Sequence, residues 1–244
     1  MNILVVHLGS RSENLVATSI LKGIKSTCPH CKIDWVTKDN SCHNLLKYSP
    51  NINNVYSLKE LAECSKEYDL LVNLYPTINP FECPNITIKN TMGFQFKEDS
   101  DKYFDILYKE KQSPYNLFQI YYRLMGMEWH GEGYDIKYYP QSKTKKNKIG
   151  IAVANANLRN YITDKLKIDN KRLWHIPYKK NLLKRLDEIN RCKEIITDDF
   201  LTFNLVVYLH KYVYFLQTVP YMFKLEYFGK GEIINVPQEI IRQP

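Results

Sequence analysis

The residue best placed to do chemistry near the start of the chain is Glu13. It follows an apolar run, residues 2–8, and a turn of small and polar residues, Gly9-Ser10-Arg11-Ser12. A carboxylate at the beginning of a helix lies at the positive end of the helix dipole, which favours its ionised form. An ionised carboxylate at the end of a strand can act as a general base. Ser10 and Glu13 also fit a capping box, and spacing alone favours that structural interpretation.

A second acidic group, Thr197-Asp198-Asp199, lies between a predicted strand and a predicted helix. Paired acids in this position can bind Mg²⁺, cap the helix or accept hydrogen bonds from sugar hydroxyls. The helix N-terminus can also receive a phosphate if basic groups lie close. The candidates for those basic groups are Arg159, Lys171, Arg172 and Lys211.

The pair Cys28-Pro-His-Cys31 has the spacing of thiol oxidoreductases. In those proteins the pair follows a strand and begins a helix, where the dipole favours thiolate. Here it lies between a predicted helix end and a predicted strand, so we expect it to be structural. The N-terminus lacks the basic region of a secretory signal, and the apolar region 200–216 is too short and polar to span a bilayer. We therefore expect a cytoplasmic protein with free thiols, or one peripheral to a membrane, with no transmembrane segment.

Strands and helices alternate along residues 1–125. The continuous apolar runs 2–8 and 69–74 are typical of strands buried on both faces. Further strands are predicted at 33–37, 54–57 and 86–89, and helices from Glu13 onward and at 44–48, 59–66, 101–111 and 116–125. This alternation predicts a parallel sheet with helices on both faces.

The pattern breaks between Tyr138 and Lys148, where Pro140 and a lysine-rich run predict a linker. A second series then predicts strands at 149–153, 194–197 and 212–216, with helices at 181–189 and 201–209. The predicted fold is therefore α/β, GT-B-like, with two Rossmann-like doubly wound domains, 1–140 and 148–244, facing a cleft. The second domain is reduced. Ligands of such sheets bind at the carboxyl ends of the strands.

Composition and charge exclude several classes of protein. The 244 residues are 44% hydrophobic, which excludes disorder as the main state. The net charge is +8; residues 140–244 hold 19 Lys and Arg against 10 Asp and Glu, and residues 1–139 hold 15 against 16. Positive charge confined to one half suggests an anionic ligand there. The first turn has neither GxGxxG nor GxxxxGK[ST], which argues against a dinucleotide oxidoreductase and a P-loop NTPase.

The segment LVVHLGSRSENLVATSILKGIKSTCPHCKIDWVTKDN resembles the opening of the heptosyltransferase-like glycosyltransferases, family 9. Glu13 falls on the family's catalytic aspartate. IPYKKNLLKRLDEINRCKEIITDDFLTFNLVVYLHKYVYFL is similar to the family's donor-binding region. There Asp199 falls on the donor-binding aspartate, Asn204 stands where the family has histidine, and Lys211 matches its lysine. Asn155 lies near the family's donor-phosphate loop.

The chain departs from the family in three places. Glutamate replaces aspartate as the base, and Leu201-Thr202 replaces the Gly-Pro of the donor loop. The stretch between Asn155 and Trp174 is shorter than in the family, so a strand and a helix of the nucleotide pocket are expected to be missing.

The resemblance implies an inverting, metal-independent glycosyltransferase without a cofactor. It would transfer a sugar from a nucleotide-diphosphate sugar, bound by the second domain, to a hydroxyl of a saccharide or glycolipid acceptor bound by the first. The implied residues are Glu13 as base, Ser10, Arg11, Ser12 and Asn14 on the acceptor side, and Asn155, Arg159, Thr197, Asp198, Asp199, Asn204 and Lys211 for the donor. The net charge leaves open a nucleic-acid acceptor, such as modified bases of phage-type DNA. The shortened second domain leaves open a degenerate, non-catalytic binding module.

Overall fold

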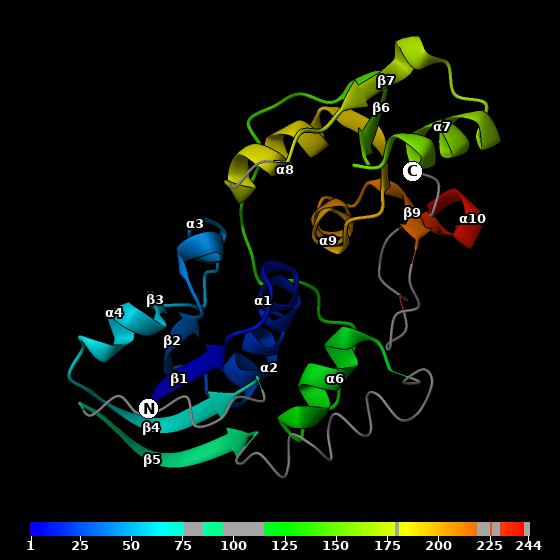
Figure 1. Cartoon of the computed structure of the whole chain (residues 1–244). Coiled ribbons are helices and arrows are strands. Elements are labelled where there is room, and N and C mark those ends of the chain that lie inside the picture. Colours follow the sequence, from blue (N-terminus) through cyan, green and yellow to red (C-terminus); the bar gives the residue numbers. More distant parts are fainter. Residues whose placement is uncertain (76–84, 95–114, 179–180, 219–224, 226–229, 242–244) are drawn as a thin grey trace. The chain divides into compact units, whose positions relative to one another are not determined.

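The computed structural model describes residues 1–75, 85–94, 115–178, 181–218, 225 and 230–241. The predicted helix at 101–111 lies outside these residues. Contacts divide the chain into two compact units, one built on Met1–Tyr138 and one that begins at Tyr139. Each unit contains a five-stranded sheet, and every strand pairing is parallel (Figure 1).

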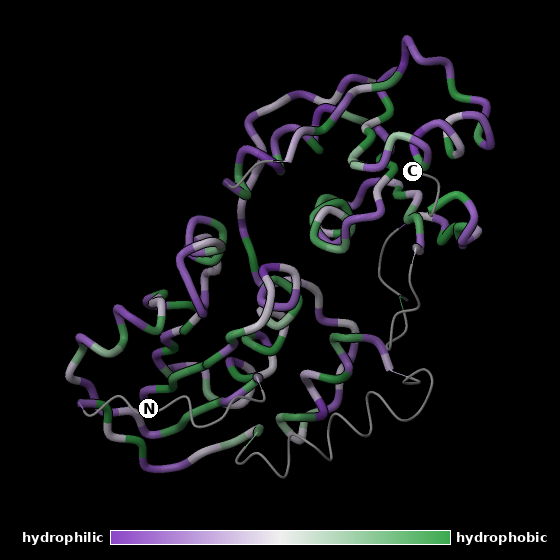
Figure 2. The backbone as a smooth tube through the Cα atoms, in the orientation of Figure 1, coloured by the Kyte–Doolittle hydropathy of each residue, from purple (hydrophilic) through white to green (hydrophobic). Residues whose placement is uncertain are grey.

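The first sheet has the strand order β3-β2-β1-β4-β5. Its strands are β1 (Asn2–His7), β2 (Lys32–Thr37), β3 (Asn54–Ser57), β4 (Lys66–Asn73) and β5 (Ile86–Gly93). Its helices are α1 (Arg11–Ala17), α2 (Ile20–Thr27), α3 (His43–Leu46), α4 (Leu58–Ala62) and α6 (Leu117–Leu124), with a 3₁₀ turn, η1, at Asn40–Cys42. The central strand β1 is hydrophobic and buried because elements cover both of its faces (Figure 2). The strand order reverses between β1 and β4.

The helix predicted from Glu13 onward is two helices, because Thr18 and Ser19 separate α1 from α2. The Thr18 hydroxyl donates to the carbonyl of Leu15 at 2.7 Å and accepts from the backbone N–H of Asp135 at 3.0 Å. A side chain that bonds its own helix backbone competes with the regular helical pattern, and here it ties the break to a distant segment.

The second sheet has the strand order β10-β9-β8-β6-β7. Its strands are β6 (Lys145–Ala152), β7 (Leu173–His175), β8 (Cys192–Thr197), β9 (Tyr212–Gln217) and β10 (Gly231–Asn235). Its helices are α7 (Ala156–Lys165), α8 (Leu182–Asn190), α9 (Phe200–Tyr208) and α10 (Gln238–Ile241), with a 3₁₀ turn, η2, at Asn170–Arg172. The order reverses between β6 and β8. The predicted fold class, α/β with two doubly wound parallel sheets, is confirmed.

One prediction for the second unit needs correction, and one segment holds elements that were not predicted. The lysine-rich run is not all linker, because β6 begins at Lys145, which pairs with Cys192. The ammonium of Lys145 also lies 5.1 Å from the centre of the Trp174 ring. The stretch between Asn155 and Trp174 is not empty either: it forms α7, η2 and the start of β7. On that side of β6 the described residues nevertheless contribute one strand, where β1 has two, β2 and β3, on the corresponding side.

Within the described residues, no helix combines the length and the apolar character that crossing a bilayer requires.

Candidate functional site

The first unit has a pocket of about 380 Å³ at the carboxyl ends of its strands. It is lined by residues 8–11 after β1, residues 37–39 after β2, and by Asn14, Ser41, Cys42 and Tyr75. The turn after β1 stands beside the point where the strand order reverses. Ligands of open α/β sheets bind at that point, so this edge is where a functional site is expected.

Glu13 and Ser10 form the capping box that their spacing predicts. The N–H of Ser10 donates to Glu13 Oε2 at 2.7 Å, and the N–H of Glu13 donates to Ser10 Oγ at 3.3 Å. The second carboxylate oxygen, Oε1, accepts no hydrogen bond from a described residue. Capping therefore uses one carboxylate oxygen and leaves the other for chemistry, but Glu13 is not itself among the residues that line the pocket.

Three side chains converge on Gly9, directly before this capping box. A Cβ atom on Gly9 would lie 2.7 Å from His7 Cε1, 2.8 Å from Glu13 Oε2 and 3.0 Å from Tyr75 Cε2. Real Cβ atoms do not tolerate contacts this short, so glycine is required here for space. The His7 ring and the Glu13 carboxylate therefore lie against the same face of the turn.

Gly9→Ala is expected to displace the Glu13 carboxylate, since its oxygen is the most movable of the three atoms. Overpacking of this kind costs about 1–3 kcal/mol of unfolding free energy. Gly133→Ala is the matched control, because a Cβ there meets no atom within 4 Å. Chemical denaturation of both variants should show a loss of stability for Gly9→Ala alone; equal stabilities would mean that the turn adapts.

The side chains flanking Glu13 have different roles. Asn14 is 1% exposed; its Nδ2 donates to the carbonyls of Gly9 and Ser10 at 3.1 and 3.0 Å, and its Oδ1 accepts from Trp35 Nε1 at 3.0 Å. Asn14 thus fixes the turn to β2, and its polar atoms are engaged within the protein. Ser12 is buried, whereas Ser10 and Arg11 line the pocket.

His7 is a buried residue that the sequence analysis did not single out as functional. It is 1% exposed, its Nδ1 accepts from the N–H of Gly9 at 3.2 Å, and its Nε2 lies 2.7 Å from the hydroxyl of Tyr121 in α6. Burial lowers the pKa of His7 to about 4, although the nearby Glu13 carboxylate opposes this shift. A histidine inside an otherwise apolar central strand was the available sequence signal.

The second unit has a pocket of about 460 Å³ at the carboxyl ends of β6, β7 and β8. It is lined by residues 151–154, residues 175–178, Arg159, Arg185, Asp198 and Asp199. The predicted residues Arg159, Asp198 and Asp199 therefore come together. The pocket again stands where the strand order reverses, between β6 and β8.

Asp199 is the N-cap of α9 and the partner of a buried arginine. Its Oδ2 accepts from the N–H of Thr202 at 3.0 Å, from the Thr202 hydroxyl at 2.6 Å and from Arg185 Nη2 at 2.6 Å. Arg185 is 3% exposed, also donates to the Thr202 hydroxyl, and lies 4.9 Å from the centre of the Tyr178 ring. The sequence signal for Arg185 was its position on the apolar face of α8, where a charge needs a partner.

The neighbours of Asp199 shape the same loop. Thr197 is fully buried; its hydroxyl donates to the carbonyl of Ala152 at 3.1 Å and accepts from the N–H of Asp199 at 3.0 Å. Thr197 therefore joins the ends of β8 and β6. Burial raises the pKa of the Asp198 carboxyl, and the charge of Asp199 adds to the rise.

Asn155 and Arg159 belong to the turn between β6 and α7, and Arg159 is the one that lines the pocket. Asn155 is the N-cap of α7, and its Oδ1 accepts from the N–H of Leu158 at 3.0 Å. Arg159 Nη1 donates to the carbonyl of Val153 at 3.1 Å. The guanidinium is therefore held across the turn between β6 and α7, at the edge of the pocket.

Four predicted donor residues do not line this pocket: Asn155 and Thr197, which hold the adjoining loops, and Asn204 and Lys211. Asn204 is fully buried within α9, where its amide donates to the carbonyl of Phe200 at 2.8 Å. Lys211 precedes β9, and its ammonium donates to the carbonyl of Cys192 at 2.7 Å and to Thr144 Oγ1 at 3.2 Å. Both partners lie at the amino edge of the sheet. A six-residue strand, about 20 Å long, separates Lys211 from the carboxyl edge.

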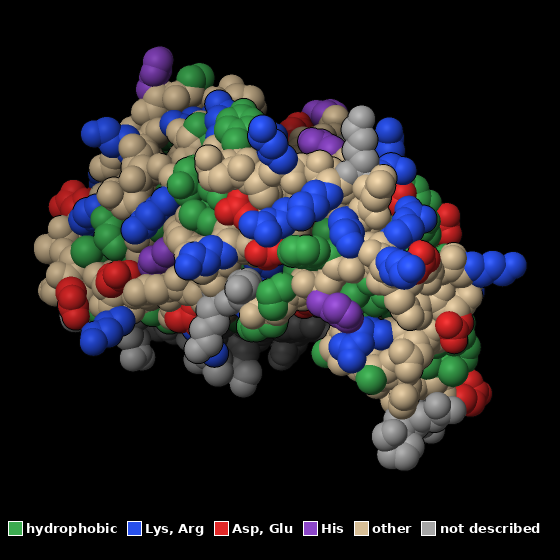
Figure 3. All heavy atoms as spheres, turned by 90° about the horizontal axis from the view of Figure 1, so that it is seen from above, with side chains coloured by type: hydrophobic (Ala, Val, Ile, Leu, Met, Phe, Trp, Pro, Cys, Tyr) green, Lys and Arg blue, Asp and Glu red, His purple; other side chains and the backbone are tan. Residues whose placement is uncertain are grey.

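Five basic residues of the second unit lie at the same amino edge. Every strand of its sheet begins with or directly follows a basic residue: Lys145 at β6, Arg172 at β7, Arg191 near β8, Lys211 at β9 and Lys230 at β10. Lys and Arg side chains are also visible on the face of the molecule that Figure 3 shows. These five basic residues therefore lie away from the pocket, where Arg159 and Arg185 are the cations among the described residues.

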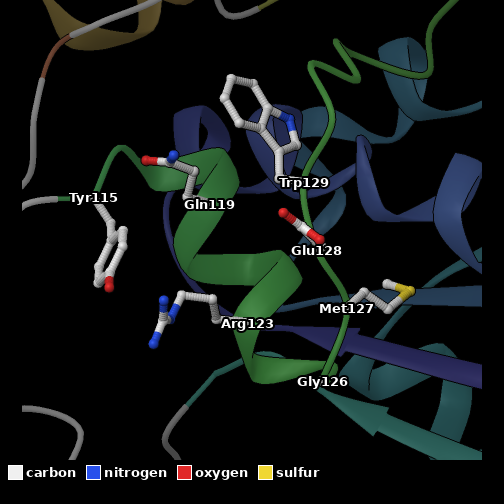
Figure 4. A pocket seen from close by; sticks show the side chains of 7 residues that line it. All are labelled: Tyr115, Gln119, Arg123, Gly126, Met127, Glu128 and Trp129. Carbon is white, nitrogen blue, oxygen red and sulfur yellow. The ribbon is translucent and has the colours of Figure 1, made fainter.

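A third pocket, of about 550 Å³, lies beside α6 and the segment after it. It is lined by Tyr115, Gln119, Arg123 and residues 126–129 (Figure 4). The Arg123 guanidinium lies 4.2 Å from the centre of the Tyr115 ring. None of the predicted site residues lines this pocket.

GT-B glycosyltransferases have this architecture of two doubly wound parallel sheets in one chain, with ligands at the carboxyl ends of the strands. Solved structures of family 9 enzymes match nearly the whole chain. A family 9 glycosyltransferase from Veillonella parvula matches with a TM-score of 0.67 and 13% identity, over 99% of this chain and 89% of that one. ADP-heptose LPS heptosyltransferase II of E. coli matches with a TM-score of 0.63 and 14% identity, over 98% and 91%.

E. coli heptosyltransferase WaaC, solved with ADP, matches with a TM-score of 0.57 and 11% identity, over 88% of this chain and 87% of that one. Neither a protein-family model nor a curated protein sequence matches the chain. At these identities the likeness establishes the fold, and the fold is that of the family 9 heptosyltransferases.

Proposed function

We propose that the chain is an inverting glycosyltransferase that uses a nucleotide-diphosphate sugar. The observation that carries the proposal is the whole-chain match to family 9 enzymes, combined with the Glu13 carboxylate in the first turn of α1, which keeps one oxygen clear of its capping bond. The donor would bind in the pocket of the second unit. The acceptor would bind beside the turn 9–13 of the first unit.

In the proposed reaction Glu13 removes the proton of an acceptor hydroxyl through Oε1. The resulting oxygen attacks the anomeric carbon and forms the new glycosidic bond. The bond from that carbon to the nucleotide diphosphate breaks on the opposite face, so the configuration inverts and the diphosphate leaves with the electron pair. Arg159 and the N-terminus of α7 would stabilise the departing charge, a role that needs no metal ion.

The donor pocket can be tested without knowing the acceptor. A ligand that binds only the folded protein stabilises it by RT ln(1 + [L]/Kd), about 2.7 kcal/mol at a concentration of 100 Kd. We expect at least one sugar nucleotide of a panel, with ADP-sugars included because WaaC was solved with ADP, to raise the melting temperature by several degrees. Arg159→Ala should remove most of this shift, whereas Lys211→Ala should retain it.

The alternative is a degenerate binding module of the same fold. The observations that favour it are that Asn204 is buried within α9 and that Lys211 lies at the far edge, so two donor residues implied by the family do not line the pocket. A folded protein that no sugar nucleotide stabilises would support this alternative over the enzyme.

The proposed acceptor is a saccharide or glycolipid hydroxyl. Residues 1–139 carry 15 basic against 16 acidic side chains, so the acceptor half offers no excess of positive charge for a nucleic acid. Product analysis with a mixed glycan acceptor and with duplex DNA would distinguish the two acceptor classes.

A further inference from the structure

The segment around Glu13 is held by two consecutive backbone N–H groups that point to different side chains. The N–H of Gly9 donates to His7 Nδ1 at 3.2 Å, and the N–H of Ser10 donates to Glu13 Oε2 at 2.7 Å. The turn that fixes the carboxylate is therefore itself fixed by the imidazole. His7 lies at the last position of β1, so the strand carries the residue that orders the turn after it.

The hydrogen bonds define the form of the His7 ring. A backbone N–H can only donate, so Nδ1 must carry a lone pair. In the neutral ring the proton is then on Nε2, which donates to the Tyr121 hydroxyl at 2.7 Å. The rings of Tyr121 and Tyr75 also pack against the imidazole, with centroid distances of 5.3 and 5.8 Å. The ring is thus oriented from α6, which is 114 positions away in the chain.

We propose that His7 is a positioning residue for Glu13: its imidazole, oriented by Tyr121, orders the Gly9-Ser10 turn so that the Glu13 carboxylate presents Oε1 to the acceptor. The inference rests on the proposed function, in which Glu13 is the base. It adds a residue pair, His7 and Tyr121, that touches neither substrate.

The neutral state of the ring matters for this role. A protonated imidazole beside Glu13 would stabilise the carboxylate and make it a weaker base. Burial keeps His7 neutral, with a pKa of about 4, and the groups that face the ring are Glu13 from α1, Tyr121 from α6 and Tyr75 after β4. The Glu13 carboxylate opposes this lowering of the His7 pKa.

The first test uses transfer activity. His7→Leu removes both ring nitrogens, whereas His7→Asn keeps an acceptor near the position of Nδ1. We expect His7→Leu to lower kcat more than tenfold with the KM values of donor and acceptor unchanged, and His7→Asn to restore much of the loss. A merely structural residue would not give this rescue together with an unchanged KM.

The second test compares two neighbouring tyrosines on α6. Tyr121→Phe removes the partner of His7 Nε2. Tyr122→Phe removes an equally buried hydroxyl, which donates to the carbonyl of Ser19 at 2.8 Å. Both should cost similar stability, but Tyr121→Phe alone should lower kcat. Equal kcat values in these two variants, or in His7→Leu and His7→Asn, would overturn the inference.

The third test needs no substrate. Nitrogen NMR of the imidazole should show the Nε2-protonated tautomer and no titration of His7 between pH 8 and about 5, and Glu13→Gln should lower the pKa of His7 further. A His7 that titrates near its usual value, unaffected by Glu13→Gln, overturns the inference even if the enzyme is active. Absence of transfer by the wild-type protein, or full activity of Glu13→Gln, would instead count against the proposed function.

Discussion

Glu13→Gln is expected to lower the rate of sugar transfer by about 10²- to 10⁴-fold, the usual contribution of a general base. Glutamine cannot accept the proton of the acceptor hydroxyl. Its amide oxygen can still accept the N–H of Ser10, so the capping box, and with it the fold, should persist. Donor affinity, measured by calorimetry, should be unchanged because the proposed donor pocket is formed by residues of the second unit.

The chain provides a matched control in a second capping box, at the start of α4. The N–H of Ser57 donates to Glu60 Oε2 at 2.7 Å, and the N–H of Glu60 donates to Ser57 Oγ at 3.3 Å. These distances equal those at Ser10 and Glu13. Glu60→Gln should therefore change stability as Glu13→Gln does but leave the transfer rate unaltered. Comparable rates in the two variants would remove Glu13 from the proposed mechanism.

Glu13→Asp tests whether the glutamate of this chain can be replaced by the aspartate that the family has at this position. The shorter side chain draws the carboxylate back by one methylene, while Gly9 and the capping serine stay in place. If the turn is adapted to glutamate, as the contacts around Gly9 indicate, this variant should be slower than wild type yet faster than Glu13→Gln. Steady-state rates of the three proteins give that order directly.

The strands and the first functional turn were predictable because their signals are local. β1 is a continuous apolar run, and the capping box needs only Ser10 and Glu13 at the right spacing. Four elements of the second unit were missed, α7, β7, β10 and α10, and they are short or have weak patterns: β7 has three residues, and α7 has two buried residues among ten. Local periodicity cannot identify such elements, because contacts with the rest of the sheet determine them.

The candidate site was harder to predict than the fold, for a geometric reason. Lys211 and Asp199 are twelve positions apart, but Lys211 precedes β9 and Asp199 follows β8, so they belong to opposite edges of one sheet. The contacts that organise the two candidate sites, in contrast, join positions far apart in the sequence. His7 is hydrogen-bonded to Tyr121, and Arg185 donates to Asp199 on the other side of strand β8. A match of residue types to a family motif shows neither the edge of the sheet at which a residue lies nor its contacts with distant residues.

The pairing of Arg185 with Asp199 leads to the second large effect that we expect. Asp199→Ala should destabilise the second unit by about 3–5 kcal/mol, because it leaves the charge of a 3% exposed guanidinium without its carboxylate. It also removes the N-cap of α9, a loss of about 1 kcal/mol by itself. Arg185→Met should cost much less, since the remaining carboxylate of Asp199 is 39% exposed to water and still caps α9 through the N–H of Thr202.

Hydrogen exchange of the α8 and α9 amides measures this difference within the second unit, independently of the first. The double variant Arg185→Met, Asp199→Ala should recover most of the stability that Asp199→Ala alone loses, because it removes the uncompensated charge together with its partner. Equal costs for the two single variants, with no recovery in the double variant, would mean that Asp199 acts only as a helix cap. In that case its carboxylate would not be the group that keeps Arg185 in the wall of the proposed donor pocket.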